Sequence, residues 1–317
     1  MNPAASIILF TTASGLGYGL LFVLGLAASC GWLPPSTLFA MLTIGLALST
    51  VSIGLLSSTF HLGHPERAWR AITQWRSSWL SREGIMAILL YGPACYFGAG
   101  WILFEQQLFA WRAVSFILAI GAAATVFCTA MIYASLKSIP RWNNQWVSVV
   151  YLSLSLMTGA LWFVAIWAFF FPVPTALSTL ALVSIIAAYV CKYCYWRYID
   201  SAPILSTAET ATGLGAKGKT RLLDPPHTGR NYLLEEMGYK VARKHASKLR
   251  TLCLFAAFGF PITCYILIYL AAGHYVTILA FMAAVLGQVG VTIERWLFFA
   301  EAEHVVMLYY GKDKVHG

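Results

Sequence analysis

Long apolar blocks separated by short polar segments run along the whole chain of 317 residues. Each block reaches at least about 18 residues, the length of a helix that crosses the hydrocarbon core of a bilayer. A segment inside lipid has to satisfy its backbone hydrogen bonds internally, so these blocks can only be helices. The pattern predicts eight membrane-spanning helices, at about residues 5–29, 36–60, 83–104, 112–136, 146–171, 174–196, 249–272 and 275–299.

The predicted fold class is therefore an all-α integral membrane protein, an eight-helix bundle that forms a single membrane domain over residues 1–317. Composition supports this prediction, because 59% of the residues are hydrophobic, only 10% are charged, and the mean hydropathy is +0.71. A soluble domain has about a quarter of its residues charged. Residues 1–29 contain no Lys or Arg, so we expect a retained helix there and not a cleaved signal peptide.

The basic residues lie almost entirely on one side of the predicted topology. With eight helices, both termini and the second, fourth and sixth loops share one face, and the opposite face holds a single basic residue, Arg112. The positive-inside rule predicts that both termini and the long loop 198–248 are cytoplasmic. From residue 231 this loop is predicted to form an amphipathic helix, whose basic face suits either anionic lipid or a protein partner.

The histidines, cysteines and charged residues exclude several kinds of cofactor chemistry. No histidine lies in the middle of a predicted span, whereas a membrane cytochrome holds its haem iron with side chains such as His on facing helices. Cys191 and Cys194 lack the second pair that a zinc site needs, so we expect no metal and no haem in this chain. Ionisable residues are also missing from the middle of the predicted spans, which predicts an uncharged bundle interior and disfavours a pump.

Candidate chemistry gathers where the second predicted span ends and the third begins. Residues 61–70 read His-Leu-Gly-His-Pro-Glu-Arg-Ala-Trp-Arg, and the third span opens with Ser-Arg-Glu at 81–83. The two ends share a face, so His61 and Glu83 are expected to approach each other at the cytoplasmic edge. An imidazole that titrates near neutrality and a partly buried carboxylate suit proton exchange with a quinone, with nearby arginines as electrostatic support. The alternative is an interfacial histidine and a glutamate that caps a helix start.

The stretch 61–70, followed by Trp-Leu-Ser-Arg-Glu at 79–83, resembles the signature of the dimethyl sulfoxide reductase anchor-subunit family, and the eight-helix layout resembles it over the whole chain. Residues 224–229 and 294–301 resemble a proteobacterial branch. The resemblance implies a subunit of the bacterial inner (plasma) membrane without haem or metal of its own. It implies binding of quinone or quinol, either menaquinone or ubiquinone. It also implies two partners, an iron–sulfur subunit with four [4Fe–4S] clusters and a molybdopterin catalytic subunit.

The same resemblance assigns the site residues. His61 and Glu83 correspond to the family's quinol-binding histidine and glutamate, and Gly63 and Arg67 belong to the same motif. We add Arg70 as electrostatic support. A docking surface for the partner is expected on segments 66–82 and 217–248, and it includes Arg76, Arg82, His227 and Arg230.

The predicted function is a quinone-reactive anchor of a molybdenum/iron–sulfur oxidoreductase, of the dimethyl sulfoxide reductase type or the sulfite dehydrogenase type. It would serve anaerobic respiration or sulfite oxidation, and its contacts would be membrane lipid and protein, not nucleic acid. A site on the cytoplasmic side predicts an electroneutral reaction. Two alternatives are a small-solute secondary transporter, which typically has inverted repeats, and a purely structural anchor without a quinone site.

Overall fold

The computed structural model describes residues 3–59, 64–106, 108–224, 237, 241–270 and 275–316. Eight helices in these ranges are long and apolar enough to cross a membrane, which confirms the predicted number. They are α1 (Ala5–Ser29), α2 (Thr37–Thr59), α3 (Trp79–Ile102), α4 (Trp111–Ala134), α5 (Trp146–Phe170), α6 (Thr175–Ser201), the helix His245–Leu270 and α11 (Tyr275–Ala300).

The seventh span combines three segments of different helical geometry, α9 (Val241–Leu254), the π-helix η3 (Phe255–Gly259) and α10 (Phe260–Leu270). At the π-turn the backbone of α11 comes close, because a Cβ added to Gly290 would lie 2.2 Å from the amide nitrogen of Ala257. Glycine permits this approach. It brings the last turns of α11 against the seventh span, which matters for the buried charges described below.

Several predicted helix ends differ from the structure, and two of the differences bear on where the charged residues of the site lie. The third span begins at Trp79 and not at 83, because the Ser78 hydroxyl accepts a hydrogen bond from the amide of Ser81 (3.4 Å) and caps the helix there. The sixth span continues to Ser201, beyond the predicted end at 196. Polar residues can extend a helix past the hydrocarbon, which an apolar block does not reveal. Glu83 and Lys192 consequently lie inside helices and not at their ends.

The eight spans form two groups that meet along α1 and α5. In the first group α1 packs on α2 and α4, and α3 packs on α4; in the second, α5 packs on α6 and α11, and α10 packs on α11. The crossing of α1 and α5 is very close, since a Cβ on Gly19 would lie 1.8 Å from the carbonyl oxygen of Ser155. Small residues allow such contacts between membrane helices. The Ser155 hydroxyl donates to the Gly15 carbonyl (2.6 Å) at the same crossing.

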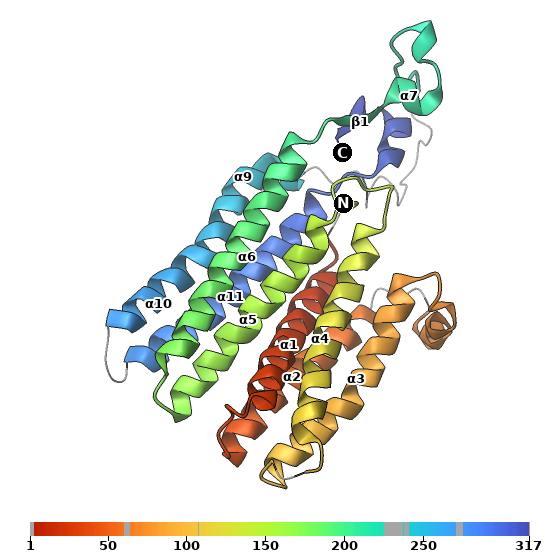
Figure 1. Ribbon diagram of the computed structural model, residues 1–317. Coiled ribbons are helices and arrows are strands. Elements are labelled where there is room, and N and C mark those ends of the chain that lie inside the picture. The colour runs from red at the N-terminus through yellow and green to blue at the C-terminus, as the bar shows by residue number, and fades with distance from the viewer. Residues whose placement is uncertain are drawn as a thin grey trace.

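Both chain termini lie at one end of the bundle, together with β1 and α7 (Figure 1). We call this the terminal end. It contains the starts of α1, α3, α5 and α9 and the ends of α2, α4, α6 and α11. That the terminal end faces the cytoplasm stays a prediction.

The terminal end carries short elements outside the bundle. A 3-10 helix, η1 (Pro65–Gln74), precedes α3, and β1 (Ile204–Thr207), α7 (Ala208–Thr212) and η2 (Gly215–Lys217) follow α6. Near the C-terminus η4 (Val305–Tyr310) leads to β2 (Lys314–His316), which pairs antiparallel with β1. The all-α prediction missed this two-stranded sheet, because strands of four and three residues are too short to show an alternating pattern. The amphipathic helix predicted from residue 231 falls largely outside the described residues.

Candidate functional site

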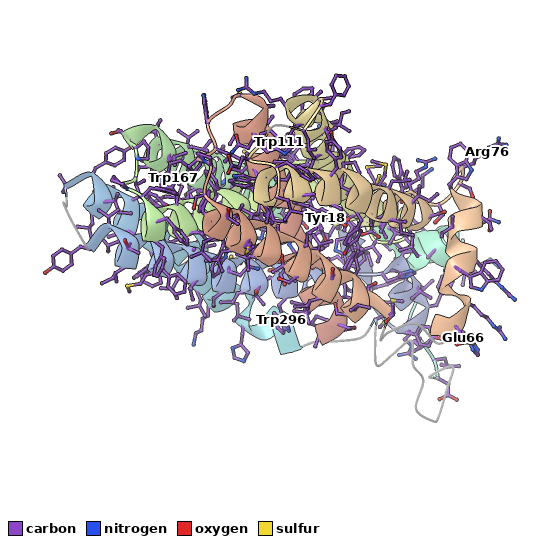
Figure 2. All side chains as sticks on the ribbon, turned by 90° about the horizontal axis from the view of Figure 1, so that it is seen from below. Tyr18, Glu66, Arg76, Trp111, Trp167 and Trp296 are labelled. Carbon is purple, nitrogen blue, oxygen red and sulfur yellow. The ribbon has the colours of Figure 1, made fainter. Side chains whose placement is uncertain are left out.

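The conspicuous motif before α3 forms an exposed segment. On η1, Arg67 and Arg70 are exposed; the Nε of Arg67 lies 3.7 Å from the Glu66 carboxylate, and the guanidinium of Arg70 lies over the Trp69 ring at 5.7 Å. Figure 2 shows Glu66 and Arg76 at the edge of the molecule and Tyr18 within the bundle. His61 and Gly63 lie outside the described residues. Within the described part, neither Arg67 nor Arg70 forms an ion pair with Glu83.

Of the four residues predicted to dock a partner, two are described. Arg76 is exposed, with its guanidinium 5.4 Å from the centre of the Trp75 ring. Arg82 donates to the carbonyl oxygens of Trp75 (2.9 Å) and Arg76 (2.7 Å), so it ties the end of the η1 segment to the first turn of α3. His227 and Arg230 lie outside the described residues.

Glu83 is buried in α3, with 3% of its surface exposed. Its Oε1 accepts a hydrogen bond from the Thr129 hydroxyl of α4 (2.8 Å). In the described part of the chain no Lys, Arg or His pairs with this carboxyl. Glu83 therefore does not cap the start of α3. It is a buried carboxyl held by one neutral hydroxyl.

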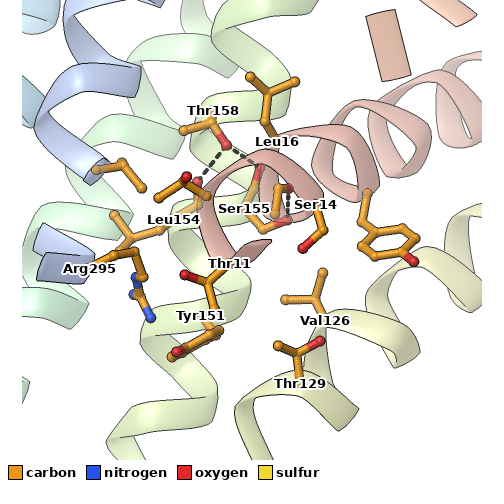
Figure 3. A pocket seen from close by; sticks show the side chains of 14 residues that line it. Thr11, Ser14, Leu16, Val126, Thr129, Tyr151, Leu154, Ser155, Thr158 and Arg295 are labelled. Atoms are coloured by element: carbon orange, nitrogen blue, oxygen red, sulfur yellow. Dashed lines mark hydrogen bonds between the residues drawn. The ribbon is translucent and has the colours of Figure 1, made fainter. Parts of the chain in front are cut away.

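Thr129 also lines a small polar cavity between the two groups of helices (Figure 3). The cavity has a volume of about 20 Å³. A cavity needs roughly 10–15 Å³ to hold one water. Polar side chains from four helices line it, namely Thr11, Thr12, Ser14 and Tyr18 of α1, Thr129 of α4, Tyr151, Ser155 and Thr158 of α5, and Arg295 of α11.

Several buried polar atoms on the wall of this cavity lack a hydrogen-bond partner. They are the hydroxyls of Tyr18 and Tyr151 and the two terminal guanidinium nitrogens of Arg295. The Arg295 guanidinium lies over the Tyr151 ring, 3.8 Å from its centre. All four atoms are hydrogen-bond donors, and a buried donor without an acceptor costs about 1–3 kcal/mol. The cavity is thus a place where a water or a ligand oxygen would be bound.

Behind Arg295 lies a buried ion cluster. Lys192 of α6 pairs with Oε1 of Glu294, and Arg295 Nε lies 2.6 Å from Glu294 Oε2. The three side chains are 1%, 0% and 3% exposed, respectively. The ammonium of Lys192 also lies over the Tyr195 and Trp196 rings, at 4.3 and 4.8 Å.

The ion cluster overturns the prediction of an uncharged interior, which had placed Lys192 and Arg295 on the cytoplasmic face. For Lys192 the error follows partly from the end of α6, which continues five residues beyond the predicted 196. For Arg295 it does not, because α11 ends within one residue of the predicted 299; Arg295 is buried because its side of the helix faces the bundle. One signal in the sequence was available. The pair Glu294-Arg295 is followed directly by Trp-Leu-Phe-Phe and preceded by a long apolar run, a context typical of burial.

An apolar groove of about 440 Å³ adjoins the polar cavity. Its walls include Phe22 of α1, Ala123 of α4 and Leu152 of α5. Val149, exposed on the outside of α5, borders it. Tyr18, Val126 and Ser155 line both the groove and the cavity, so an elongated apolar ligand with a polar head would fit the two together.

Metal ligation is not evident in the described ranges, where no group of three or more His, Cys, Asp or Glu lies close enough to hold a metal ion. The seven cysteines are free thiols, and three of them, Cys128, Cys253 and Cys264, are buried. The groups that do come together are hydroxyls, a carboxyl and buried cations. They suit a ligand that accepts hydrogen bonds and exchanges protons.

Comparison with known proteins identifies two relationships. The family of DMSO reductase anchor subunits (DmsC) matches residues 1–301. The chain is also 32% identical, over 325 aligned residues, to a subunit of the sulfite dehydrogenase of Allochromatium vinosum, and the alignment covers 98% of this chain and 99% of that protein. Both matches include Glu83, the polar cavity and the ion cluster.

Proposed function

Because the chain belongs to the DMSO reductase anchor-subunit family, we propose that it anchors a molybdenum/iron–sulfur oxidoreductase in the membrane and exchanges electrons between quinone and the iron–sulfur subunit. The relative named as a sulfite dehydrogenase subunit favours the sulfite dehydrogenase type of complex. The observation that carries the quinone proposal is the buried carboxyl of Glu83 beside a polar cavity that adjoins an apolar groove. Membership in this family gives no support to the transporter alternative.

Glu83 is the proposed proton-exchanging group of the site. A bound quinone would supply the redox chemistry, two electrons with two protons. The Glu83 carboxyl is suited to take up or release a proton, because no cation is paired directly with it within the described residues. His61 is the proposed second proton-exchanging group, with Gly63 in the same motif and the exposed Arg67 and Arg70 as electrostatic support.

The groove between α1, α4 and α5 is the proposed entry for the lipid-soluble ligand. Its volume of about 440 Å³ lies in the range of about 300–1,000 Å³ that is usual for small-molecule sites. The apolar side chains of Phe22, Ala123 and Leu152 suit an isoprenoid tail. Tyr18 stands where the groove meets the cavity and offers an unpartnered hydroxyl to a carbonyl oxygen of the head group.

The terminal end is the proposed docking face for the partner proteins. Arg76 is exposed there, and Arg82 donates to its carbonyl oxygen and so holds the turn between η1 and α3. Anchor-subunit membership implies an iron–sulfur partner and a catalytic partner; we propose that the iron–sulfur partner holds four [4Fe–4S] clusters and that His227 and Arg230 also contact it. With this end in the cytoplasm of a bacterium, the protons of the quinone reaction are exchanged with the cytoplasm and turnover is electroneutral.

The test replaces one carboxyl in the assembled complex. Glu83→Gln keeps the size and the hydrogen bond to Thr129 but cannot ionise, and we expect it to lower quinone-linked turnover by about 100-fold or more, the range of general acid–base catalysis. Turnover of the catalytic partner with an artificial soluble redox reagent should stay at the wild-type rate. The matched control is Glu105→Gln, the same change in the connection between α3 and α4 at the opposite end. Unchanged quinone-linked turnover in Glu83→Gln would leave the passive anchor as the better description.

A further inference from the structure

Two buried carboxyls, Glu83 and Glu294, are each bonded to a residue that lines the polar cavity, and their charges are balanced differently. On one side Thr129 lines the cavity, and its hydroxyl donates a hydrogen bond to Glu83. On the other side is the cluster of Lys192, Glu294 and Arg295, with two cations and one anion. The cluster carries one surplus positive charge when all three groups are ionised, whereas ionised Glu83 adds one negative charge with no cation paired to it among the described residues.

Arg295 is the member of the cluster that lines the cavity. Its Nε is paired with Glu294, whereas its two terminal nitrogens are buried without a hydrogen-bond partner. Guanidinium nitrogens are donors only, so they require an acceptor. One water in the cavity would supply it and would link Arg295 to the hydroxyl network of Thr129. The ring of Tyr151 lies against the Arg295 guanidinium, and Tyr151 interacts electrostatically with both Arg295 and Glu83.

We propose that the Lys192–Glu294–Arg295 cluster is the buried counter-charge of Glu83, acting across the water-sized cavity, so that α11 sets the pH range in which Glu83 ionises. Arg295 is then a positioning residue, since it acts through Glu83. The inference rests on the proposed function only in assigning Glu83 the exchange of protons with quinone. A cluster with surplus positive charge repels a proton, so the same geometry argues against a proton path through α11.

The other titratable groups around Glu83 do not supply this charge. Tyr18 of α1, Cys128 and Tyr133 of α4 and Tyr151 of α5 all interact with it electrostatically. Tyr and Cys side chains are neutral near pH 7. The described helix α2 contains no titratable residue. Arg82, next to Glu83 on α3, is half-buried and interacts electrostatically with Cys128, but its guanidinium donates to the carbonyl oxygens of Trp75 and Arg76 and forms no ion pair with Glu83.

The experiment follows the protonation of Glu83 itself, with no quinone turnover needed. The carboxyl C=O infrared band of the purified complex, assigned by its loss in Glu83→Gln, is titrated with pH. Arg295→Gln and Lys192→Met each remove a positive charge and should raise the pH midpoint by about half a unit or more, whereas Glu294→Gln removes the negative charge and should lower it. Arg112→Gln, the same charge change at the opposite end of the bundle, should leave the midpoint unchanged. Repeating the series in a His61→Gln background removes any contribution of that imidazole.

Opposite signs distinguish an electrostatic role from a structural one. A merely structural cluster would shift the midpoint in the same direction in all three variants, or not at all, and either result overturns the proposal. If Glu294→Gln fails to assemble, the comparison with Arg112→Gln still tests the proposal. Arg295→Gln and Lys192→Met must raise the midpoint, whereas Arg112→Gln must leave it unchanged. If the midpoint shifts as expected but Glu83→Gln leaves quinone turnover unchanged, the proposed function is refuted and this inference stands. If Glu83→Gln lowers quinone turnover but the cluster variants leave the midpoint unchanged, this inference is refuted and the proposed function stands.

Discussion

Glu83 and Glu294 are two buried carboxyls in the same end of one bundle, and they have very different surroundings. Glu294 is fully buried between Lys192 and Arg295, with an oxygen paired to each cation. Glu83 is almost as buried, yet it has one hydroxyl partner and no paired cation within the described residues. Between them lies a cavity large enough for one water.

The difference supports the proposal that Glu83, and not Glu294, exchanges protons. Two cations stabilise the ionised form of Glu294, so its charge is fixed and part of the structure. Glu83 changes its protonation state at lower cost, because the Thr129 hydroxyl can hydrogen-bond to it in either form. At the opposite end of the bundle the core around Phe39 consists instead of aromatic rings, including Trp101, Phe163 and Trp167.

The largest expected effect is on the stability of the complex, which should depend on Glu294 far more than on Glu83. Glu294→Leu leaves Lys192 and Arg295 buried without their anion, and breaking a buried ion pair costs about 3–5 kcal/mol. We expect little or no assembled complex from this variant, whereas Glu83→Gln assembles like the wild type. Yield and thermal unfolding of the complex in mild detergent measure the difference. Equal losses in both variants would show that the two carboxyls are structurally equivalent.

A second prediction concerns the groove that leads to Glu83. Ala123→Trp fills the space between α4 and α5 and should raise the KM for quinone about tenfold, since the filled groove no longer admits the tail. Ala176→Trp is the matched control, because Ala176 lines another apolar groove of about 550 Å³ beside Trp167 and Leu177. A larger effect of the control on KM would move the quinone site to that second groove.

The smallest predicted effect tests the single hydrogen bond on Glu83. Thr129→Val removes the hydroxyl with little change in volume, and a neutral hydrogen bond contributes about 0.5–1.5 kcal/mol. Quinone-linked turnover should fall roughly three- to tenfold, and Thr129→Ser should restore most of it. The pH profile of turnover, recorded for both variants, shows whether the loss follows Glu83. A wild-type profile and rate in Thr129→Val would mean that this hydroxyl does not serve the carboxyl.

Much of the fold follows from the sequence, and the reasons for the exceptions are physical. Apolar blocks of membrane-spanning length predict the eight helices. They do not predict that Ser78 starts α3 before Glu83, because that start is a hydrogen bond of a polar residue outside the apolar block. Nor do they predict that α6 extends to Ser201.

The surroundings of the proposed site were predicted only in part. Glu83 was singled out from its motif, and its role stays a proposal, whereas Arg295 was assigned to an aqueous face. Hydropathy indicates how far a residue lies from the end of an apolar block but not which side of the helix faces the bundle. Burial of Lys192, Glu294 and Arg295 depends on contacts between α6 and α11. The paired residues Lys192 and Glu294 are 102 residues apart along the chain, so a local sequence pattern does not reveal the contact. The polar cavity likewise forms only where α1, α4, α5 and α11 meet.

The most direct test of quinone binding in the groove that adjoins the polar cavity is photoaffinity labelling of the assembled complex with a photoreactive quinone analogue, followed by peptide mapping. We expect the label on the helices that line the groove next to Glu83, near Tyr18, Ala123 or Leu152, and we expect excess native quinone to prevent it. Labelling confined to the second groove, near Trp167 and Leu177, would contradict the assignment of the quinone site to the groove between α1, α4 and α5.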